Sequence, residues 1–187
     1  MSYSTLYLVF KTKARPIAEY HNGWGTGPAA WTLMSMVACG KDESMPPYIG
    51  GEEAQKEFWH RLYSPNLTDA QRLGILLTYD GSIIEPNGLA QASVMCRQFH
   101  RDILAKTHWT WSHFGAIGET LAELANKGVD KRSIGVGLNC TSVCDVWQEY
   151  NYLKGKPKKP LWGIFGELGA VKSRSKEVAE KERANVV

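Results

Sequence analysis

The stretch His21-Asn22-Gly23-Trp24-Gly25-Thr26-Gly27-Pro28 separates two different patterns of apolar residues. Before it the apolar residues alternate, as in a β-hairpin, and after it nearly every position to Cys39 is apolar. Glycines permit a sharp change of chain direction, and proline suits the first turn of a helix because its missing N–H would be unpaired there. The stretch therefore predicts a junction between a hairpin and a buried helix.

Working outward, residues 5–12 have two apolar faces, which predicts a central strand. Residues 13–15 turn the chain, and residues 16–21 return beside the first strand. After the junction, residues 28–39 are apolar around most of a helical circumference, which is typical of a buried helix. Gly40 provides a suitable end for that helix.

The rest of the chain adds helices and strands in turn. Helical spacing of apolar residues predicts helices over 51–63, 87–105, 118–127 and 145–152. Thr68-Asp69-Ala70-Gln71 resembles a capping box that starts only about one turn. Alternation then predicts a strand over 73–79, with a hairpin at Asp80-Gly81 leading to 82–84. A further strand is predicted over 133–138.

These elements predict an α+β fold in a single domain, with a mainly antiparallel sheet of about five strands packed with four to five helices. We expect residues 1–153 to form the globular part and residues 154–187 to form a basic, partly apolar tail. The segment Lys154–Pro160 marks the boundary, and a helical end is expected from Val171. Formal charges are +5 for the tail and −2 for the rest.

The glycine-rich segment is the first candidate site. Exposed backbone N–H groups near a helix N-terminus can hold a phosphate or carboxylate. The candidate ligand-binding residues are His21, Gly23, Trp24, Gly25, Thr26 and Gly27. The segment matches neither a Walker loop nor the dinucleotide pattern, so the alternative is a corner where glycines allow close packing.

The tail is the second candidate site. Its candidate partner-binding residues are Lys154, Lys156, Lys158, Lys159, Trp162 and Phe165. An apolar patch directly after a lysine-rich linker either packs back on the protein or contacts a partner, and we expect packing. A basic tail also leaves nucleic-acid binding open, although a total charge of only +3 does not indicate it for the chain as a whole.

The cysteines Cys39, Cys96, Cys140 and Cys144 lack the spacing of a disulfide framework, which favours reduced thiols in the cytoplasm. Cys96 with His100, and Cys140 with Cys144, have the spacing of one helical turn and would make a Cys₃His zinc set. Because the usual C-x₂-C spacing is missing, no metal and no cofactor are expected.

Catalytic signatures are weak. Asp80 or a thiol of Cys140 or Cys144 would be the candidate group, but no nucleophile elbow, triad or paired-carboxylate pattern is present.

The aromatic run 108–114 has no interleaved cations, which favours packing over base stacking. No leader segment and no membrane-spanning run is expected.

Three short motifs carry a resemblance over about residues 5–147: Asn22-Gly23-Trp24-Gly25, Thr78-Tyr79-Asp80-Gly81 and Gly137-Leu138-Asn139-Cys140-Thr141-Ser142-Val143. With them the chain resembles a loose group of small accessory proteins encoded by phages and bacteria. The resemblance implies no catalytic residues. It implies a protein that binds and inhibits a host protein, defence complexes such as CRISPR included, by analogy.

The sequence therefore predicts a non-enzymatic binding protein, with a host protein or protein complex as partner. Two alternatives stay open. One is a small-molecule or nucleotide-binding protein, or an enzyme, that uses residues 22–28. The other is nucleic-acid binding through the basic tail.

Overall fold

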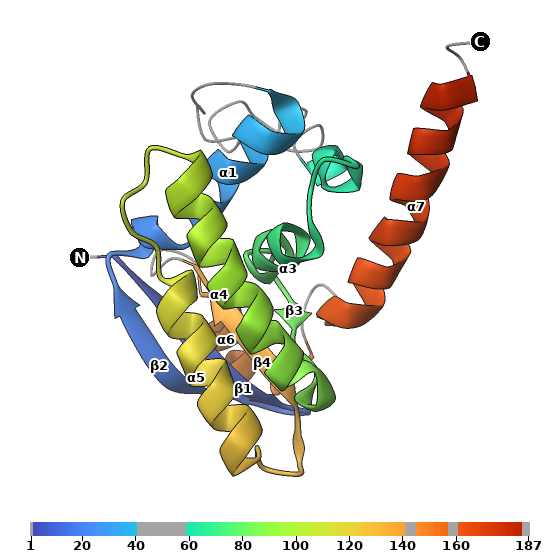
Figure 1. Ribbon diagram of the computed structural model, residues 1–187. Helices are drawn as coiled ribbons and strands as arrows, with labels where there is room; N and C mark the ends of the chain where they lie inside the picture. Colours follow the sequence, from blue (N-terminus) through green and yellow to red (C-terminus); the bar gives the residue numbers. More distant parts are fainter. Residues whose placement is uncertain (1, 41–58, 141–144, 157–160, 185–187) are drawn as a thin grey trace.

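A three-stranded antiparallel sheet forms the middle of the fold (Figure 1). The computed structural model describes residues 2–40, 59–140, 145–156 and 161–184, without the side chains of Cys39 and of residues 178–184. In sheet order the strands are β2 (Ala14–His21), β1 (Tyr3–Phe10) and β4 (Ser133–Asn139). Leu8 in β1 lies opposite Arg15 on one side and Val136 on the other, so the predicted central strand is confirmed.

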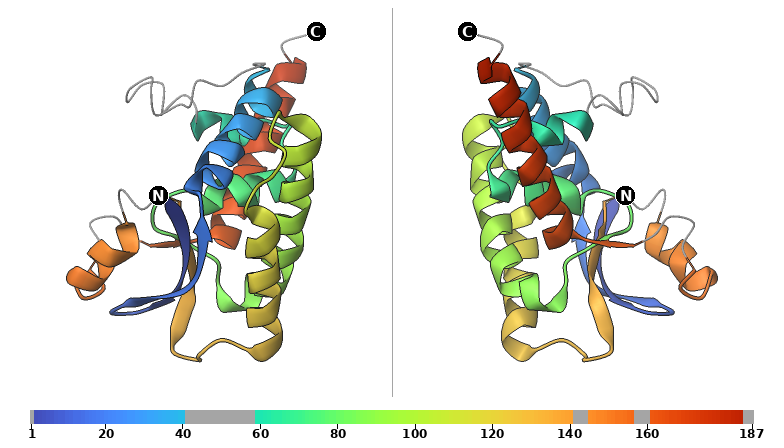
Figure 2. Two further views of the ribbon diagram at one scale, coloured as in Figure 1. Left: turned by 90° about the vertical axis from the view of Figure 1, so that its left-hand side faces the viewer. Right: turned by 90° about the vertical axis from the view of Figure 1, so that its right-hand side faces the viewer.

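The two faces of the sheet are covered by different helices (Figure 2). Along β1, Leu6 and Leu8 contribute to the main core, whereas Tyr7 and Val9 contribute to a smaller core on the other face. The main core is closed by α1, α3, α4, α5 and α7, and the smaller one by α6. These helices are α1 (Gly27–Cys39), α3 (Asp69–Leu77), α4 (Leu89–Lys106), α5 (Phe114–Lys127), α6 (Val146–Tyr152) and α7 (Ile164–Ala184).

The short helix α6 packs closely against the sheet because Gly137 in β4 has no side chain at the point of contact. A Cβ placed on Gly137 would lie 2.1 Å from the ring of Trp147, which is fully buried. Asp145 precedes the helix, and its carboxylate accepts hydrogen bonds from the backbone N–H groups of Trp147 and Gln148. The same carboxylate accepts a 2.5 Å hydrogen bond from the Tyr7 hydroxyl. The predicted helix over 145–152 is confirmed, with Asp145 as its cap.

Helix α1 confirms the junction between hairpin and buried helix. Ala29, Ala30, Leu33 and Met34 have no exposed surface. The helix ends at Gly40, whose φ of 62° lies in the left-handed region that glycine adopts without strain.

The predicted strand over 73–79 is wrong, because residues 69–77 form helix α3. Thr68 and Gln71 make both hydrogen bonds of a capping box at its start. The Gln71 side chain also donates to the Asp102 carboxylate on α4 at 2.8 Å. Every residue from Ala70 to Leu77 is buried, so the apolar alternation reflects a helix enclosed on all sides.

The predicted hairpin at Asp80-Gly81 is also wrong. Gly81 does adopt a positive φ of 81°, but the turn links α3 to β3 (Ser82–Ile83). The two-residue strand β3 pairs in parallel with β5 (Trp162–Gly163). Ile84 then forms an antiparallel bridge to Val136 in β4.

Several boundaries differ from the predictions. Asn87 lies in a 3₁₀ turn over Pro86–Gly88 and does not cap α4, which begins at Leu89. Helix α5 begins at Phe114 instead of Gly118. Most of the predicted helix over 51–63 lies outside the described residues, and Arg61–Tyr63 forms a 3₁₀ turn.

The tail packs on the rest of the protein. Helix α7 begins at Ile164, earlier than the predicted Val171. Its buried residues are spaced three or four apart and are Ile164, Leu168, Val171 and Ser175. This spacing presents one face of α7 to α3 and to the Arg61–Tyr63 turn. The packed arrangement is the one that we expected for the apolar patch.

The predicted α+β class in a single domain is confirmed. The sheet is smaller than predicted, since three strands form the antiparallel sheet and the other two described strands pair in parallel. The described residues contain six α-helices instead of four to five. Among them, no helix combines the length and apolarity needed to cross a membrane.

Candidate functional site

The turn of the β1–β2 hairpin and the start of β4 border an open hollow. Its volume is about 570 Å³. It is lined by Phe10, Lys11, Thr12, Lys13 and Arg15 from the hairpin and by residues 130–134 from the segment that enters β4. Antiparallel pairing explains the meeting, because Phe10 at the end of β1 lies opposite Ser133 at the start of β4.

The end of α6 borders the same hairpin turn. The Tyr150 hydroxyl donates to the backbone carbonyls of Phe10 and Lys11, at 2.7 and 2.9 Å. A Cβ on Gly155 would lie 2.1 Å from the Lys11 carbonyl oxygen, and the φ of Gly155 is 78°. Glycine is therefore needed where the segment after α6 crosses the turn, and this contact brings Lys154 and Lys156 to the hairpin.

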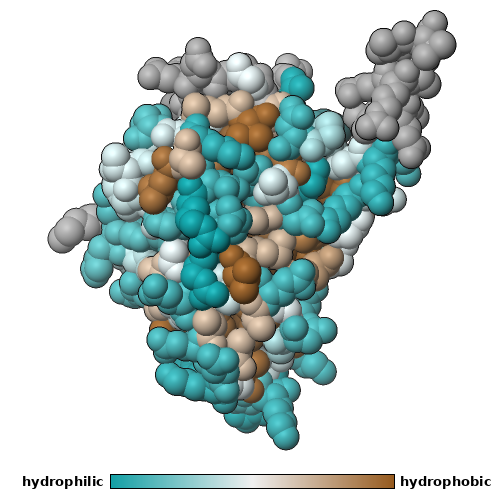
Figure 3. All heavy atoms as spheres, viewed as in Figure 1, coloured by the Kyte–Doolittle hydropathy of each residue, from teal (hydrophilic) through white to brown (hydrophobic). Residues whose placement is uncertain are grey.

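Together these segments form what we call the basic surface: Lys11, Lys13, Arg15, Lys131, Arg132, Lys154 and Lys156. All seven side chains are exposed. Residues 10–15, 130–134 and 150–156 hold only one carboxylate beside them, Asp130. Figure 3 shows hydrophilic side chains gathered at the lower end of the molecule, where α5 leads into β4.

The Asp130 carboxylate already forms an ion pair with Arg132. Its carboxylate accepts two hydrogen bonds from the Arg132 guanidinium, at 2.7 and 3.1 Å, and one from the Arg132 backbone N–H. The Arg132 side chain, then its backbone N–H and the charge of Arg15, lower the pKa of Asp130 to about 2. The carboxylate therefore stays ionised and compensates Arg132, while the other cations of the basic surface keep an excess of positive charge.

The chemistry of this surface suits multivalent anions. Lysine ammonium groups bind phosphates as point charges, and arginine guanidinium groups bind them through two N–H donors. The cations come from three separate segments: the hairpin turn with the start of β2, the residues before β4 and the turn after α6. Those of the first two segments line the hollow, and the third segment is held against the hairpin turn. Such an arrangement can contact several phosphates at once.

The glycine-rich segment lies at the opposite end of the hairpin and is a closely packed corner. A Cβ on Gly25 would lie 2.0 Å from the Trp111 ring, and one on Gly23 would lie 2.9 Å from the Cys140 carbonyl oxygen. Thr26 is buried, and its hydroxyl accepts a hydrogen bond from the Ser4 hydroxyl at 2.8 Å. Gly27 packs against Trp31.

Several backbone N–H groups of this segment donate within the chain. Gly23 donates to the Ser2 carbonyl, Gly25 to Asn22 and Thr26 to Gly23. His113 donates its own backbone N–H to the Gly25 carbonyl at 2.8 Å. Of the predicted wall residues, His21 is exposed and Trp24 is 54% exposed. The geometry favours the packing alternative, and ligand binding at residues 22–28 stays a prediction.

Replacing Gly25 with Ala separates the two alternatives. If the segment is a packing corner, the added methyl displaces the Trp111 ring, and we expect the free energy of unfolding to fall by about 1 kcal/mol. Because Trp111 is 36% exposed, its ring can swing outward, which limits the loss. Urea unfolding of both proteins measures this. An unchanged stability, combined with a loss of phosphate-induced thermal shift, would instead support an anion site.

The tail residues divide into two groups. Lys154 and Lys156 belong to the basic surface, whereas Lys158 and Lys159 lie outside the described residues. Trp162 and Phe165 are half-buried: the Trp162 backbone N–H donates to Gly81, and the Phe165 ring fills the space beside Gly88. Much of the apolar surface predicted to meet a partner therefore packs within the protein.

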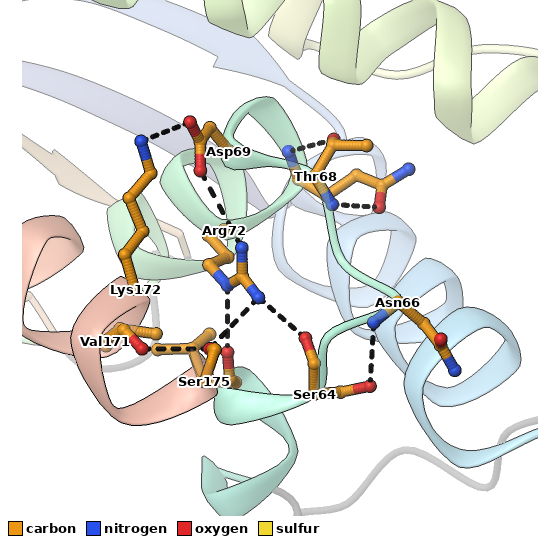
Figure 4. Close-up of polar contacts among 10 residues, drawn as sticks. Ser64, Asn66, Thr68, Asp69, Arg72, Val171, Lys172 and Ser175 are labelled. Carbon is orange, nitrogen blue, oxygen red and sulfur yellow. Dashed lines mark hydrogen bonds and ion pairs between the residues drawn. The ribbon is translucent and has the colours of Figure 1, made fainter. Parts of the chain in front are cut away.

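A buried arginine anchors α7 (Figure 4). The Arg72 guanidinium donates to the carbonyls of Leu62 and Ser64, at 3.2 and 2.7 Å, and to the Ser175 hydroxyl at 3.2 Å. Asp69 lies 3.7 Å from it and also pairs with Lys172. Burial lowers the pKa of Arg72 from its ordinary value and Asp69 opposes this, but arginine stays protonated at any physiological pH.

The cysteines show no sign of a metal set or a reactive thiol among the described residues. Cys96 is fully buried in the main core, and His100 instead lies 2.8 Å from the Ser112 hydroxyl. No group of three or more potential ligands gathers in the described part of the chain. Cys144 and the side chain of Cys39 lie outside it. Burial raises the pKa of Cys96 to about 12, and partial burial raises that of Cys140, which keeps some exposed surface.

We therefore expect Cys96 and Cys140 to resist alkylation in the folded protein at pH 8. A thiol reacts as its thiolate, and a raised pKa leaves almost none of it at that pH. Iodoacetamide labelling followed by peptide mass spectrometry checks each cysteine separately. Both residues should label in urea, and rapid labelling of Cys140 without urea would contradict the expectation.

The aromatic run 108–114 serves packing, as expected. Trp109 donates to the Thr32 hydroxyl at 3.2 Å, Trp111 covers Gly25, and Phe114 is fully buried against Phe99. Trp111 nevertheless keeps 36% of its surface exposed.

Sequence reasoning missed the five cations that the globular part adds to the basic surface. A local signal existed: Lys11 lies at the end of the predicted first strand, Lys13 and Arg15 lie in the predicted turn, and Lys131-Arg132 directly precedes a predicted strand. Antiparallel pairing of that strand with the first one would have put these two groups of cations together.

Comparisons of the chain with protein-family models, curated proteins and solved structures found no match, so its own residues and geometry must support any functional conclusion.

Proposed function

We propose that this chain is a non-enzymatic binding protein that contacts the phosphate backbone of a nucleic acid through the basic surface. The observation that carries the proposal is the meeting of five exposed cations and one compensated carboxylate around a single hollow, with Lys154 and Lys156 beside the same hairpin turn. Phosphate contacts of this kind supply most of the affinity in sequence-independent binding. The proposal moves the predicted nucleic-acid contact from the tail alone to a surface shared by the hairpin, β4 and α6.

The experiment is a fluorescence anisotropy titration of the full chain with labelled 20-nucleotide single strands and 20-base-pair duplexes. We expect a Kd of roughly 1–100 μM near physiological salt, the range of non-specific binding. Between 50 and 200 mM salt, the logarithm of the association constant should fall linearly with the logarithm of the salt concentration. For single strands, the slope of this line should be about −0.7 for each phosphate that the protein contacts.

A double substitution locates the binding. Lys11→Gln with Lys13→Gln should weaken binding roughly tenfold and reduce the salt slope for single strands by about 1.4, because two phosphate contacts are lost. The matched control is Arg101→Gln with Lys106→Gln, which removes the same charge from exposed positions of α4 near α1. Absence of binding, or an equal loss in both double variants, would contradict the proposal.

Deleting residues 154–187 is not a clean test, because it would remove α7 from the core. Ile164, Leu168 and Val171 are all buried there. Point substitutions of Lys154 and Lys156 to Gln test the contribution of the tail without that loss, and we expect each to reduce the salt slope.

A second candidate function is the binding of a host protein, as inhibitors encoded by phages do. It is favoured by Trp24, which is 54% exposed, and by Trp111, which is 36% exposed and lies against the adjacent Gly25. An exposed tryptophan is typical of energetically dominant contacts in protein interfaces. If a protein partner is captured from host lysate, Trp24→Ala should abolish its capture while leaving the nucleic-acid affinity unchanged. A partner retained equally by the variant would exclude this surface.

A further inference from the structure

Tyr152 is the most exposed large side chain with apolar character in the described residues, at 86%. Its position is rigidly held. Tyr150, two residues earlier, is 2% exposed and donates to two carbonyls of the hairpin turn. The Asn151 side chain accepts from the Ala14 backbone N–H at 2.5 Å and donates to the Ala14 carbonyl at 2.8 Å. The exposure of Tyr152 is therefore not the result of a loose segment.

The chain after Tyr152 forms a defined turn that carries two cations. Lys154 has a φ of 51°, and its backbone N–H donates to Asn151 at 3.1 Å. Gly155 donates to Tyr150 at 3.0 Å, and Lys156 donates to Leu153 at 3.1 Å. These bonds fix the backbone of Lys154 and Lys156 two and four residues after Tyr152, while Gly155 packs against the Lys11 carbonyl. An exposed aromatic ring thus stands at the edge of the basic surface.

This pairing of a ring with cations has a specific use. An aromatic side chain can stack on the face of an unpaired base while neighbouring cations bind the phosphates on either side. In a duplex the faces of the bases are covered by their neighbours, and the ring finds no partner. Trp24, the next most exposed aromatic residue of the described part, lacks such surroundings in the sequence: it follows the far end of β2, and no lysine or arginine lies within residues 20–30.

We propose that Tyr152 stacks on an unpaired base and that the basic surface consequently prefers single-stranded to double-stranded nucleic acid. The inference rests on the proposed function, since the cations must hold the strand for the ring to reach a base. The aromatic ring supplies the preference for single strands, whereas the cations supply affinity for either form.

The experiment compares Tyr152→Ala with Tyr152→Phe in the full chain, using labelled oligothymidine of 20 nucleotides and a 20-base-pair duplex. We expect Tyr152→Ala to weaken single-strand binding about 5- to 150-fold, the range found for loss of one stacked base. The salt slope should stay unchanged, because no phosphate contact is lost. Tyr152→Phe keeps the ring and should retain the affinity, and duplex binding should change less than twofold in both variants.

Two further readouts make the outcome specific. Oligothymidine carrying 5-iodouracil should cross-link to Tyr152 on irradiation, as located by peptide mass spectrometry. Trp24→Ala, the control for loss of an exposed ring, should leave single-strand affinity within twofold. If the wild-type protein binds both forms equally and Tyr152→Ala binds like it, the stacking inference is overturned while the proposed function stands. If neither form binds, both fail.

Discussion

Replacing Arg72 with Met is expected to lower the free energy of unfolding by about 2–4 kcal/mol. Met keeps much of the apolar stem but removes the three hydrogen bonds to Leu62, Ser64 and Ser175. Arg72 is only 5% exposed, so water does not readily replace the lost donors. Each buried acceptor left without a partner costs roughly 1–3 kcal/mol. Urea unfolding followed by circular dichroism measures the change.

The matched control is Lys172→Met, which removes a surface ion pair with Asp69 on the same contact. Both side chains of that pair are more than 40% exposed, and such pairs contribute about 0–1 kcal/mol. Hydrogen exchange should also show that Arg72→Met weakens protection in α7 more than in β1. Equal effects of Arg72→Met and Lys172→Met would mean that apolar packing alone holds α7.

Gly74→Ala should destabilise the protein by about 1–3 kcal/mol, although alanine is the better helix former by about 1 kcal/mol. Gly74 lies inside α3, and a Cβ there would meet Phe99 ring atoms of α4 at 2.0 to 2.5 Å. Phe99 is fully buried and packs edge-on against Phe114, so its ring has nowhere to move. Steric overlap therefore outweighs helix propensity.

Gly166→Ala provides the opposite case in α7. No atom lies within 4 Å of the added Cβ, so only propensity acts, and we expect a gain of up to about 1 kcal/mol. Thermal unfolding of both variants gives the comparison. A stabilising effect of Gly74→Ala would show that α3 and α4 are farther apart than the structure has them.

The parts of the fold that the sequence predicts well depend on local patterns. Alternation predicts a central strand over residues 5–12, which the structure has at Tyr3–Phe10, and Pro28 and Gly40 mark the ends of α1. The pattern fails at α3, because a helix buried on all sides has no polar face to reveal its period. There the capping box of Thr68 and Gln71 was the better guide. Likewise, Asp80-Gly81 is a turn, but β3 pairs with Trp162–Gly163, which no neighbouring residue indicates.

The candidate site was predicted only in part, for a related reason. The lysines of residues 154–156 lie in a segment that is basic overall. Lys11, Lys13 and Arg15 lie in the globular part, whose formal charge of −2 gives no sign of a basic cluster. Sheet pairing brings Lys131 and Arg132 to them across more than 100 residues of sequence. Net charge per segment cannot detect such a cluster, since it depends on which strand ends share an edge.

The contact between Arg72 and Ser175 also bears on how the protein is made. The two residues are 103 positions apart, so at about 5–20 residues per second the ribosome adds Ser175 roughly 5–20 seconds after Arg72. During that interval the nascent chain holds an apolar helix with one side uncovered. The newly synthesised protein is therefore expected to be most vulnerable to aggregation, and to benefit most from chaperones, before α7 emerges.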